Sequence, residues 1–196
     1  MTTASDRRGW RTIDIVVAAV VAVAFGVVFV AWNTLWAVTE PLFVALPPAQ
    51  AILYGVWLLP AVLVGLIVRR PGAAFFGGLV SAAVSALIGS QWGADALISG
   101  AAQGLGAELG FAIGLYRSWS LPTALLAAAL AGVAATVHDV VVYYAATGVE
   151  FWAVYGLAAT LSGVLIAGVG GWMLLRALVG TGVLHDFAAG RDQREV

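Results

Sequence analysis

Long apolar runs constrain what this chain can fold into more than any other feature of its sequence. The first begins at Ile15, shortly after Arg11, and continues without a charge to Ala31, where Trp32 follows. About 20 apolar residues, each rising about 1.5 Å along a helix, cross the hydrocarbon core of a bilayer. Of all residues, 62% are hydrophobic and 10% are charged, whereas a soluble domain carries about 25% charged residues. The sequence therefore predicts an integral membrane protein.

Five further apolar segments follow the first. Backbone polar groups find no water inside a bilayer, so only helices and closed barrels cross it, and these runs are too long and too uniformly apolar for barrel strands. We predict an all-α integral membrane protein, a six-transmembrane-helix bundle over residues 12–178. An N-terminal arm, 1–11, and a C-terminal tail, 179–196, flank the bundle. The five further segments are 50–68, 72–89, 93–116, 121–144 and 151–175.

Positive charge is confined to one side of this predicted bundle. The nine basic residues are all arginines, and they fall before the first helix, between the second and third, between the fourth and fifth, and after the sixth. The intervening loops, 37–49, 90–92 and 145–150, contain none. Because arginine-rich loops face the cytoplasm, we predict that both termini are cytoplasmic (N-in/C-in). The arginines are Arg7, Arg8, Arg11, Arg69, Arg70, Arg117, Arg176, Arg191 and Arg194.

Aromatic and polar side chains gather at the predicted outer ends of the helices. An aromatic belt at the membrane interface would account for the tryptophans and tyrosines. It would not account for Asn33, His138 and Asp139, which we expect one to two turns or more below the surface. Ionisable groups at membrane depth are costly and usually functional. The candidate ligand-binding residues at these ends are Trp32, Asn33, Trp36, Tyr54, Trp57, His138, Asp139 and Tyr143.

Glu108 is predicted to be the deepest ionisable group. Nine residues separate it from Arg117, which on a straight helix corresponds to roughly 13 Å. A carboxylate at that depth needs a cationic ligand, a hydrogen-bond network or a proton. We therefore add Glu108, and Gln103 about a turn and a half above it, to the candidate ligand-binding residues. A structural role for Glu108 is the alternative, and the glycines around it could break the helix and change its depth.

Patterns for catalysis or metal binding are missing from the sequence. His138 has no second histidine within the membrane with which to share a metal ion, no Gly-x-Ser motif indicates a membrane protease, and the chain has no cysteine. The net charge of −1 gives no indication of nucleic-acid binding. We expect no enzymatic activity, no cofactor, no metal and no nucleic-acid partner.

Small residues recur at every fourth position of the first helix. Ala18, Ala22 and Gly26 form this stripe, and small residues let a second helix approach closely. The stripe could dock a partner membrane subunit or pack inside the bundle. Continued upward, it reaches Asn33 and Trp36 on the same side of the helix. Burial of Ala18 and Ala22 inside the bundle would favour internal packing.

Two segments carry a resemblance to a known family. Residues 11–36, RTIDIVVAAVVAVAFGVVFVAWNTLW, and residues 103–111, QGLGAELGF, resemble the YkoE-type S components of energy-coupling factor (ECF) transporters. The size and the six-helix topology fit this family across nearly the whole chain. S components of this class carry an Ala-x-x-x-Ala motif on the first helix that meets the coupling subunit, and Ala18-x-x-x-Ala22 matches it.

The resemblance implies a substrate-capture subunit for thiamine or its hydroxymethylpyrimidine precursor in the bacterial plasma membrane. It also implies a coupling transmembrane subunit and two cytoplasmic ATPase subunits as partners. Alternatives are an S component for another small vitamin or nucleobase, and a membrane scaffold or assembly protein without a transport role.

The candidate residues suit this ligand chemically. Tryptophan and tyrosine faces can stack on the aminopyrimidine and attract the thiazolium cation, while amides and a carboxylate can pair with the ring nitrogens and the exocyclic amine. Either Glu108 or Asp139 could supply the anion. We expect the pocket to open outward and to be capped by the loop 37–49, where Pro47 and Pro48 limit flexibility.

Overall fold

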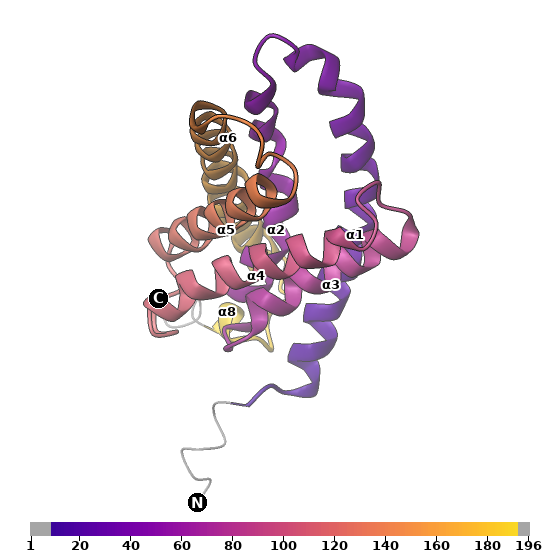
Figure 1. Cartoon of the computed structure of the whole chain (residues 1–196). Coiled ribbons are helices and arrows are strands. Elements are labelled where there is room, and N and C mark those ends of the chain that lie inside the picture. Colours follow the sequence, from indigo (N-terminus) through magenta and orange to yellow (C-terminus); the bar gives the residue numbers. More distant parts are fainter. Residues whose placement is uncertain (1–8, 192–196) are drawn as a thin grey trace, which may run out of the picture.

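The computed structural model describes residues 9–191, and these residues form helices joined by short connections, with no β-strand among them (Figure 1). The all-helical prediction is therefore confirmed for this part of the chain. The elements are α1 (Thr12–Thr39), η2 (Glu40–Phe43), η3 (Pro47–Leu53), α2 (Gly55–Val68), α3 (Ala73–Ile88), α4 (Asp95–Ile113), α5 (Leu121–Val142), α6 (Val149–Ser162), η4 (Gly163–Gly170), α7 (Gly171–Gly180) and α8 (Ala188–Arg191).

Five helical segments are long and apolar enough to cross a membrane. The predicted third span differs from the others, because α3 is apolar but has only 16 residues. Helix α4 continues unbroken through its glycines, so these residues do not interrupt the helix that carries Gln103 and Glu108. The five segments are Thr12–Phe43, Pro47–Val68, Asp95–Ile113, Leu121–Val142 and Val149–Gly180.

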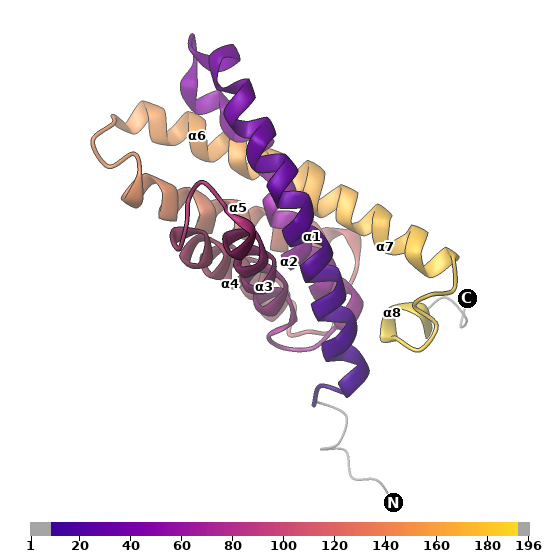
Figure 2. The ribbon, with the colours of Figure 1, turned by 90° about the vertical axis from the view of Figure 1, so that its right-hand side faces the viewer.

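The last of these segments is one long helix with a π-helical middle. Helices α6, η4 and α7 follow one another in a single line (Figure 2). Ser162, the last residue of α6, accepts a hydrogen bond from the Gly55 amide at 2.9 Å and donates one to the Ile52 carbonyl. These bonds satisfy backbone groups at the junction between η3 and α2. They also fix the neighbouring Tyr54, which lines the site described below.

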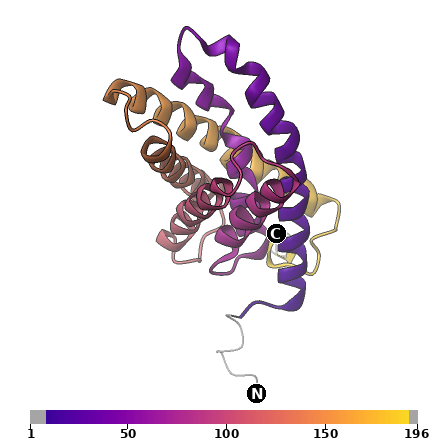
Figure 3. The same ribbon diagram turned by 45° about the vertical axis from the view of Figure 1, so that its right-hand side comes forward.

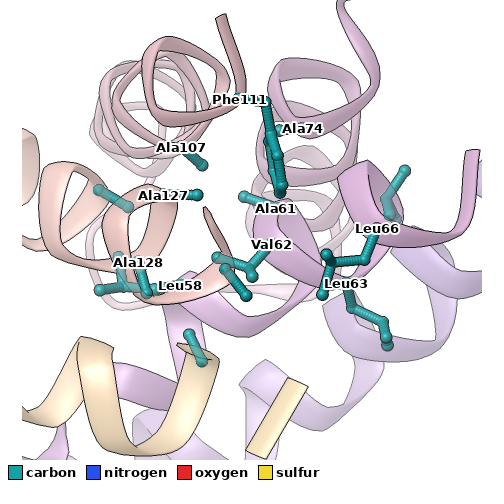
Figure 4. Close-up of a cluster of buried hydrophobic side chains, with 14 of the residues drawn as sticks. Leu58, Ala61, Val62, Leu63, Leu66, Ala74, Ala107, Phe111, Ala127 and Ala128 are labelled. Carbon is teal, nitrogen blue, oxygen red and sulfur yellow. The ribbon is translucent and has the colours of Figure 1, made fainter. Parts of the chain in front are cut away.

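Helix α2 lies at the centre of the bundle. Nearly all its residues from Leu58 to Val68 are buried, and its side chains meet Phe111 of α4 and Ala127 of α5 in the cluster of Figure 4. Neighbouring helices pack closely because small residues face one another. A Cβ atom added at Gly110 would lie 2.4 Å from the Cα of Ala127.

We predict that Gly110→Ala destabilises the protein by about 1–3 kcal/mol, because the added methyl group would press on the α5 backbone. Gly114→Ala is the matched control on the same helix end. A Cβ atom at Gly114 would come no closer than 3.4 Å to another atom. Thermal unfolding in detergent should show a clearly lower Tm for the first variant alone. Equal Tm values for the two variants would contradict this packing.

The Ala18, Ala22 and Gly26 stripe faces into the bundle. Ala18 is 1% exposed and Ala22 is fully buried. Helix α1 packs against α3, and a Cβ atom at Gly26 would lie 2.8 Å from the carbonyl oxygen of Ser81. The burial of both alanines favours internal packing over the docking of a partner, and we interpret the stripe in that way.

The connection between α1 and α2 lies at the opposite end of the bundle from the start of α1, which Trp10 precedes in the sequence (Figures 1 and 3). At the Trp10 end, the Trp10 indole donates to the carbonyl of Pro71 at 2.9 Å. The segment after α7 also packs there, because Leu184 and Phe187 are buried and the Arg11 guanidinium lies 5.9 Å from the Phe187 ring. Part of the predicted C-terminal tail is therefore a packed element of the fold.

Candidate ligand-binding site

A cavity of about 180 Å³ lies between the helices. It is lined by the last turns of α1 and α5, the first turns of α2, α4 and α6, and part of α3. Because neighbouring helices run in opposite directions, polar residues at alternating helix ends meet here. The lining residues are Phe29, Asn33, Trp36, Tyr54, Trp57, Gly78, Ala82, Ser85, Ser90, Trp92, Asp95, Ala96, Ser99, Gly100, Gln103, Asp139, Tyr143, Tyr144 and Tyr155.

Four aromatic rings form one wall of the cavity, and Trp57 is at its centre. The Trp57 ring centroid lies 5.2 Å from those of Trp36 and Tyr54 and 5.3 Å from that of Trp92. Edge-on and tilted contacts of this kind hold rings firmly while leaving faces free for a planar ligand. We call these four residues the aromatic wall.

Asn33 holds the aromatic wall in place from α1. Its Oδ1 accepts a hydrogen bond from the Trp57 indole at 3.0 Å, and its Nδ2 donates to the Ser85 hydroxyl at 3.2 Å. The side chain is buried, and these bonds link α1, α2 and α3. Trp32 lies outside the cavity, because its indole donates to the Leu53 carbonyl at 2.9 Å and holds η3 against α1.

The cavity is also lined by two carboxylates, Asp95 and Asp139, that share one histidine. Nδ1 of His138 lies 2.8 Å from Oδ1 of Asp139, and its Nε2 lies 3.3 Å from Oδ1 of Asp95. The Tyr155 hydroxyl donates to Asp139 at 2.5 Å, and the Tyr143 hydroxyl donates to Asp95. These bonds join α4, α5 and α6. His138 itself does not line the cavity and acts through the two carboxylates.

Tyr143 lies just beyond the end of α5 and remains a hydrogen-bond donor at physiological pH. Partial removal of water from the hydroxyl and its hydrogen bond to Asp95 raise the pKa of Tyr143 well above its usual value. The hydroxyl therefore keeps the proton that it donates to Asp95. Deeper in the cavity, the Gln103 amide donates to Ser99 at 2.7 Å and to the Tyr54 hydroxyl at 3.3 Å.

Glu108 lies outside the cavity and binds the start of α3. Its carboxylate accepts hydrogen bonds from the amides of Gly72 at 2.6 Å and Ala74 at 2.9 Å, and from the Tyr116 hydroxyl at 2.8 Å. An anion at a helix N-terminus satisfies free N–H groups and complements the helix dipole. Burial and this hydrogen bond raise the pKa of Tyr116 to about 12. The structure thus supplies the hydrogen-bond network that a carboxylate at this position needs, and we no longer assign Glu108 to the ligand.

The predicted depth of Glu108 assumed a straight helix as far as Arg117. Helix α4 instead ends at Ile113, and Leu115 and Tyr116 adopt positive φ angles of 52° and 54°. The chain therefore turns back after Ile113. Glu108 lies only about a turn and a half from the helix end.

We predict that Glu108→Gln lowers the Tm of the protein and changes its ligand affinity less than about twofold. The amide keeps the size of the side chain but has only one oxygen to accept from the N–H groups of α3, which costs about 1–3 kcal/mol. Paired thermal unfolding and binding titrations measure the two effects. A large loss of affinity at unchanged Tm would return Glu108 to the ligand site.

The cavity brings together most of the ligand-binding candidates but also contains residues outside that set. Asn33, Trp36, Tyr54, Trp57, Gln103, Asp139 and Tyr143 line it, whereas Trp32, Glu108 and His138 do not. The additional polar and aromatic lining residues include Trp92, Asp95, Tyr144 and Tyr155. They lie at the predicted outer ends of helices, as the candidates there do. This position is the sequence signal by which they could have been found. None of residues 37–49, the expected cap, lines the cavity.

Within residues 9–191, no three His, Cys, Asp or Glu side chains are placed to hold a metal ion together. The carboxylates and the histidine of the cavity are instead engaged with one another and with tyrosine hydroxyls. The cavity therefore combines stacking surfaces with negative charge. This combination suits a planar, electron-poor or cationic organic ligand.

Comparisons with known proteins find similarity to components of membrane transport systems. Residues 13–134 match a family described as the permease component of ABC-type cobalt transport systems. YkoE of Bacillus subtilis (strain 168), described as a candidate HMP/thiamine permease protein, is 31% identical over 189 residues, which are 96% of this chain and 94% of that protein. A crystal structure of an S component of an ECF transporter superposes with a TM-score of 0.90 at 31% identity, and covers 95% of this chain and 94% of that chain.

Proposed function

Because the chain belongs to the YkoE-type S components of energy-coupling factor (ECF) transporters, we propose that it captures thiamine or the hydroxymethylpyrimidine precursor of thiamine. The observation that carries this proposal is the cavity itself, which the aromatic wall lines together with Asp95 and Asp139. The protein is a multi-pass plasma-membrane protein. It binds its ligand without chemical change.

The ligand's two rings suit the aromatic and the acidic residues of the cavity. The aromatic wall stacks on the aminopyrimidine or the thiazolium ring, and the tryptophan faces attract the positive charge. Asp139 and Asp95 pair with the cation or with the exocyclic amine. Asn33 and Gln103 add amides to the lining of the cavity. Of the two anions considered from the sequence, Asp139 is the one that we propose for the ligand.

We propose the six-span, N-in/C-in arrangement for transport, with α3 as the shortest span. Arg11 and Arg69 then lie at the cytoplasmic end, and the cavity opens toward the outside. A coupling transmembrane subunit and two cytoplasmic ATPase subunits supply the energy for import. The described part of the chain contains helices and short connections alone, which supports a division of labour of this kind.

A binding titration separates this proposal from its alternatives. Isothermal titration of the purified protein with thiamine, hydroxymethylpyrimidine and riboflavin should give a Kd of about 1 μM or lower for at least one of the first two, corresponding to about 8 kcal/mol. Binding of riboflavin alone would indicate an S component for another vitamin. Binding of none of the three would contradict the proposal.

A further inference from the structure

We infer that the cavity selects the dephosphorylated form of its ligand, and that Asp95 is a specificity-determining residue for this choice. The inference rests on the proposed function and adds to it a discrimination between alcohols and their phosphate esters. It follows from the charges around the cavity, from the position of Asp95 on α4, and from the contacts that hold its carboxylate.

Within residues 9–191, the lining of the cavity offers a phosphate group no free cation. Its lining residues belong to 29–57, 78–103 and 139–155, and none of the nine arginines falls in these ranges. The nearest basic group is His138, and both of its ring nitrogens already face carboxylates, at 2.8 Å and 3.3 Å. With His138 as an imidazolium, the three groups together carry one negative charge. A phosphate ester would add its own negative charge to this site.

Asp95 lies at the type of helix end that often binds a phosphate. It is the first residue of α4, and helix N-termini bind phosphates through their free N–H groups and dipole. Here that end of the helix already carries the protein's own carboxylate. The Tyr143 hydroxyl and His138 hold it in place. The backbone amides of Asp95, Ala96 and Leu97 already donate to the carbonyls of the preceding turn. A phosphate near this helix end would therefore meet the Asp95 carboxylate, with none of these three amides free to bind it.

Asp95 is also the more accessible of the two carboxylates. Its side chain is 24% exposed, compared with 8% for Asp139, and its partner Tyr143 is 44% exposed. A ligand that enters from this side meets Asp95 first. Like charges a few ångströms apart repel strongly where water is partly excluded. Asp95 therefore acts against phosphate esters at the more open side of the cavity.

The test compares esters and alcohols in matched pairs. Titration of the wild-type protein should show that thiamine monophosphate binds at least about a hundredfold more weakly than thiamine, and that the phosphate of hydroxymethylpyrimidine binds more weakly than the alcohol. Asp95→Asn keeps the shape of the side chain and removes its charge. It should therefore lower the ratio of the Kd for thiamine monophosphate to the Kd for thiamine about tenfold. If the Asp95→Asn variant does not fold, Asp95→Ser takes its place, because serine also suits a helix start. It should lower the same ratio of Kd values by a similar factor.

Glu150→Gln is the control, because Glu150 is an exposed acidic residue in the first turn of α6 and does not line the cavity. The ratio of the Kd for thiamine monophosphate to the Kd for thiamine should be the same in Glu150→Gln as in the wild type. Equal wild-type affinities for thiamine and its monophosphate would overturn the inference about phosphate esters and leave the proposed function standing. An unchanged ratio of the two Kd values in the folded Asp95 variants would do the same. Failure of the wild-type protein to bind either thiamine or hydroxymethylpyrimidine would overturn the proposed function instead.

Discussion

Replacement of Trp57 with alanine is expected to weaken thiamine binding about a hundredfold. Trp57 lies at the centre of the aromatic wall, within 5.3 Å of three other ring centroids. Loss of one stacking face and of its attraction for a cation costs about 3 kcal/mol, which corresponds to roughly a hundredfold in Kd. The change also removes the indole N–H that Asn33 accepts. Titration of the purified variant measures the effect.

Two further variants separate stacking from other effects of this change. Trp57→Phe keeps an aromatic face but lacks the N–H, so we expect an intermediate loss of about tenfold. Trp172→Ala removes a tryptophan from α7 whose ring lies 4.8 Å from the Arg176 guanidinium, outside the cavity. Its affinity should equal that of the wild type. If Trp57→Ala bound thiamine as tightly as Trp172→Ala, the aromatic wall would not be the ligand site.

Asp139→Asn is expected to separate the two proposed ligands by charge. The amide can still accept from the Tyr155 hydroxyl, so the contact between α5 and α6 is kept and the protein should fold. Loss of the negative charge should weaken binding of cationic thiamine about 10- to 100-fold. Neutral hydroxymethylpyrimidine should lose clearly less. Parallel titrations with the two ligands measure this difference.

Asp139→Leu provides the contrasting structural result. It leaves Nδ1 of His138 and the Tyr155 hydroxyl without their partner, which costs about 1–3 kcal/mol for each unsatisfied group, and it should lower the Tm. Equal losses of affinity for thiamine and hydroxymethylpyrimidine in the Asp139→Asn variant would show that the carboxylate does not distinguish the cation. Asp139 would then be a structural residue of the α4, α5 and α6 contact.

The sequence predicts the helical membrane fold because hydropathy reports directly on a lipid environment. It predicts the cavity less completely. Polar residues at alternating helix ends indicate where the helices meet, and this pattern found Asn33, Trp57 and Asp139. Whether such a residue faces inward depends on the rotation of its helix. Asp95 and Tyr155 are at the same kind of position, and the pattern alone did not distinguish them from an interfacial belt.

Long-range backbone geometry accounts for the remaining differences. The position of Glu108 depends on the turn at Leu115 and Tyr116, where neither residue is a glycine that would signal a positive φ. The stripe with Ala22 permits close packing on either an internal or an external neighbour. Its inward direction follows from the way α1 lies against α3.

Native mass spectrometry of the protein purified from cells supplied with thiamine and hydroxymethylpyrimidine tests the ligand-capture function most directly. We predict a 1:1 complex whose added mass equals that of thiamine or hydroxymethylpyrimidine, and much less of this complex for Trp57→Ala than for Trp172→Ala. A wild-type protein that carries neither ligand, and that acquires neither when both are added after purification, would contradict the proposed function.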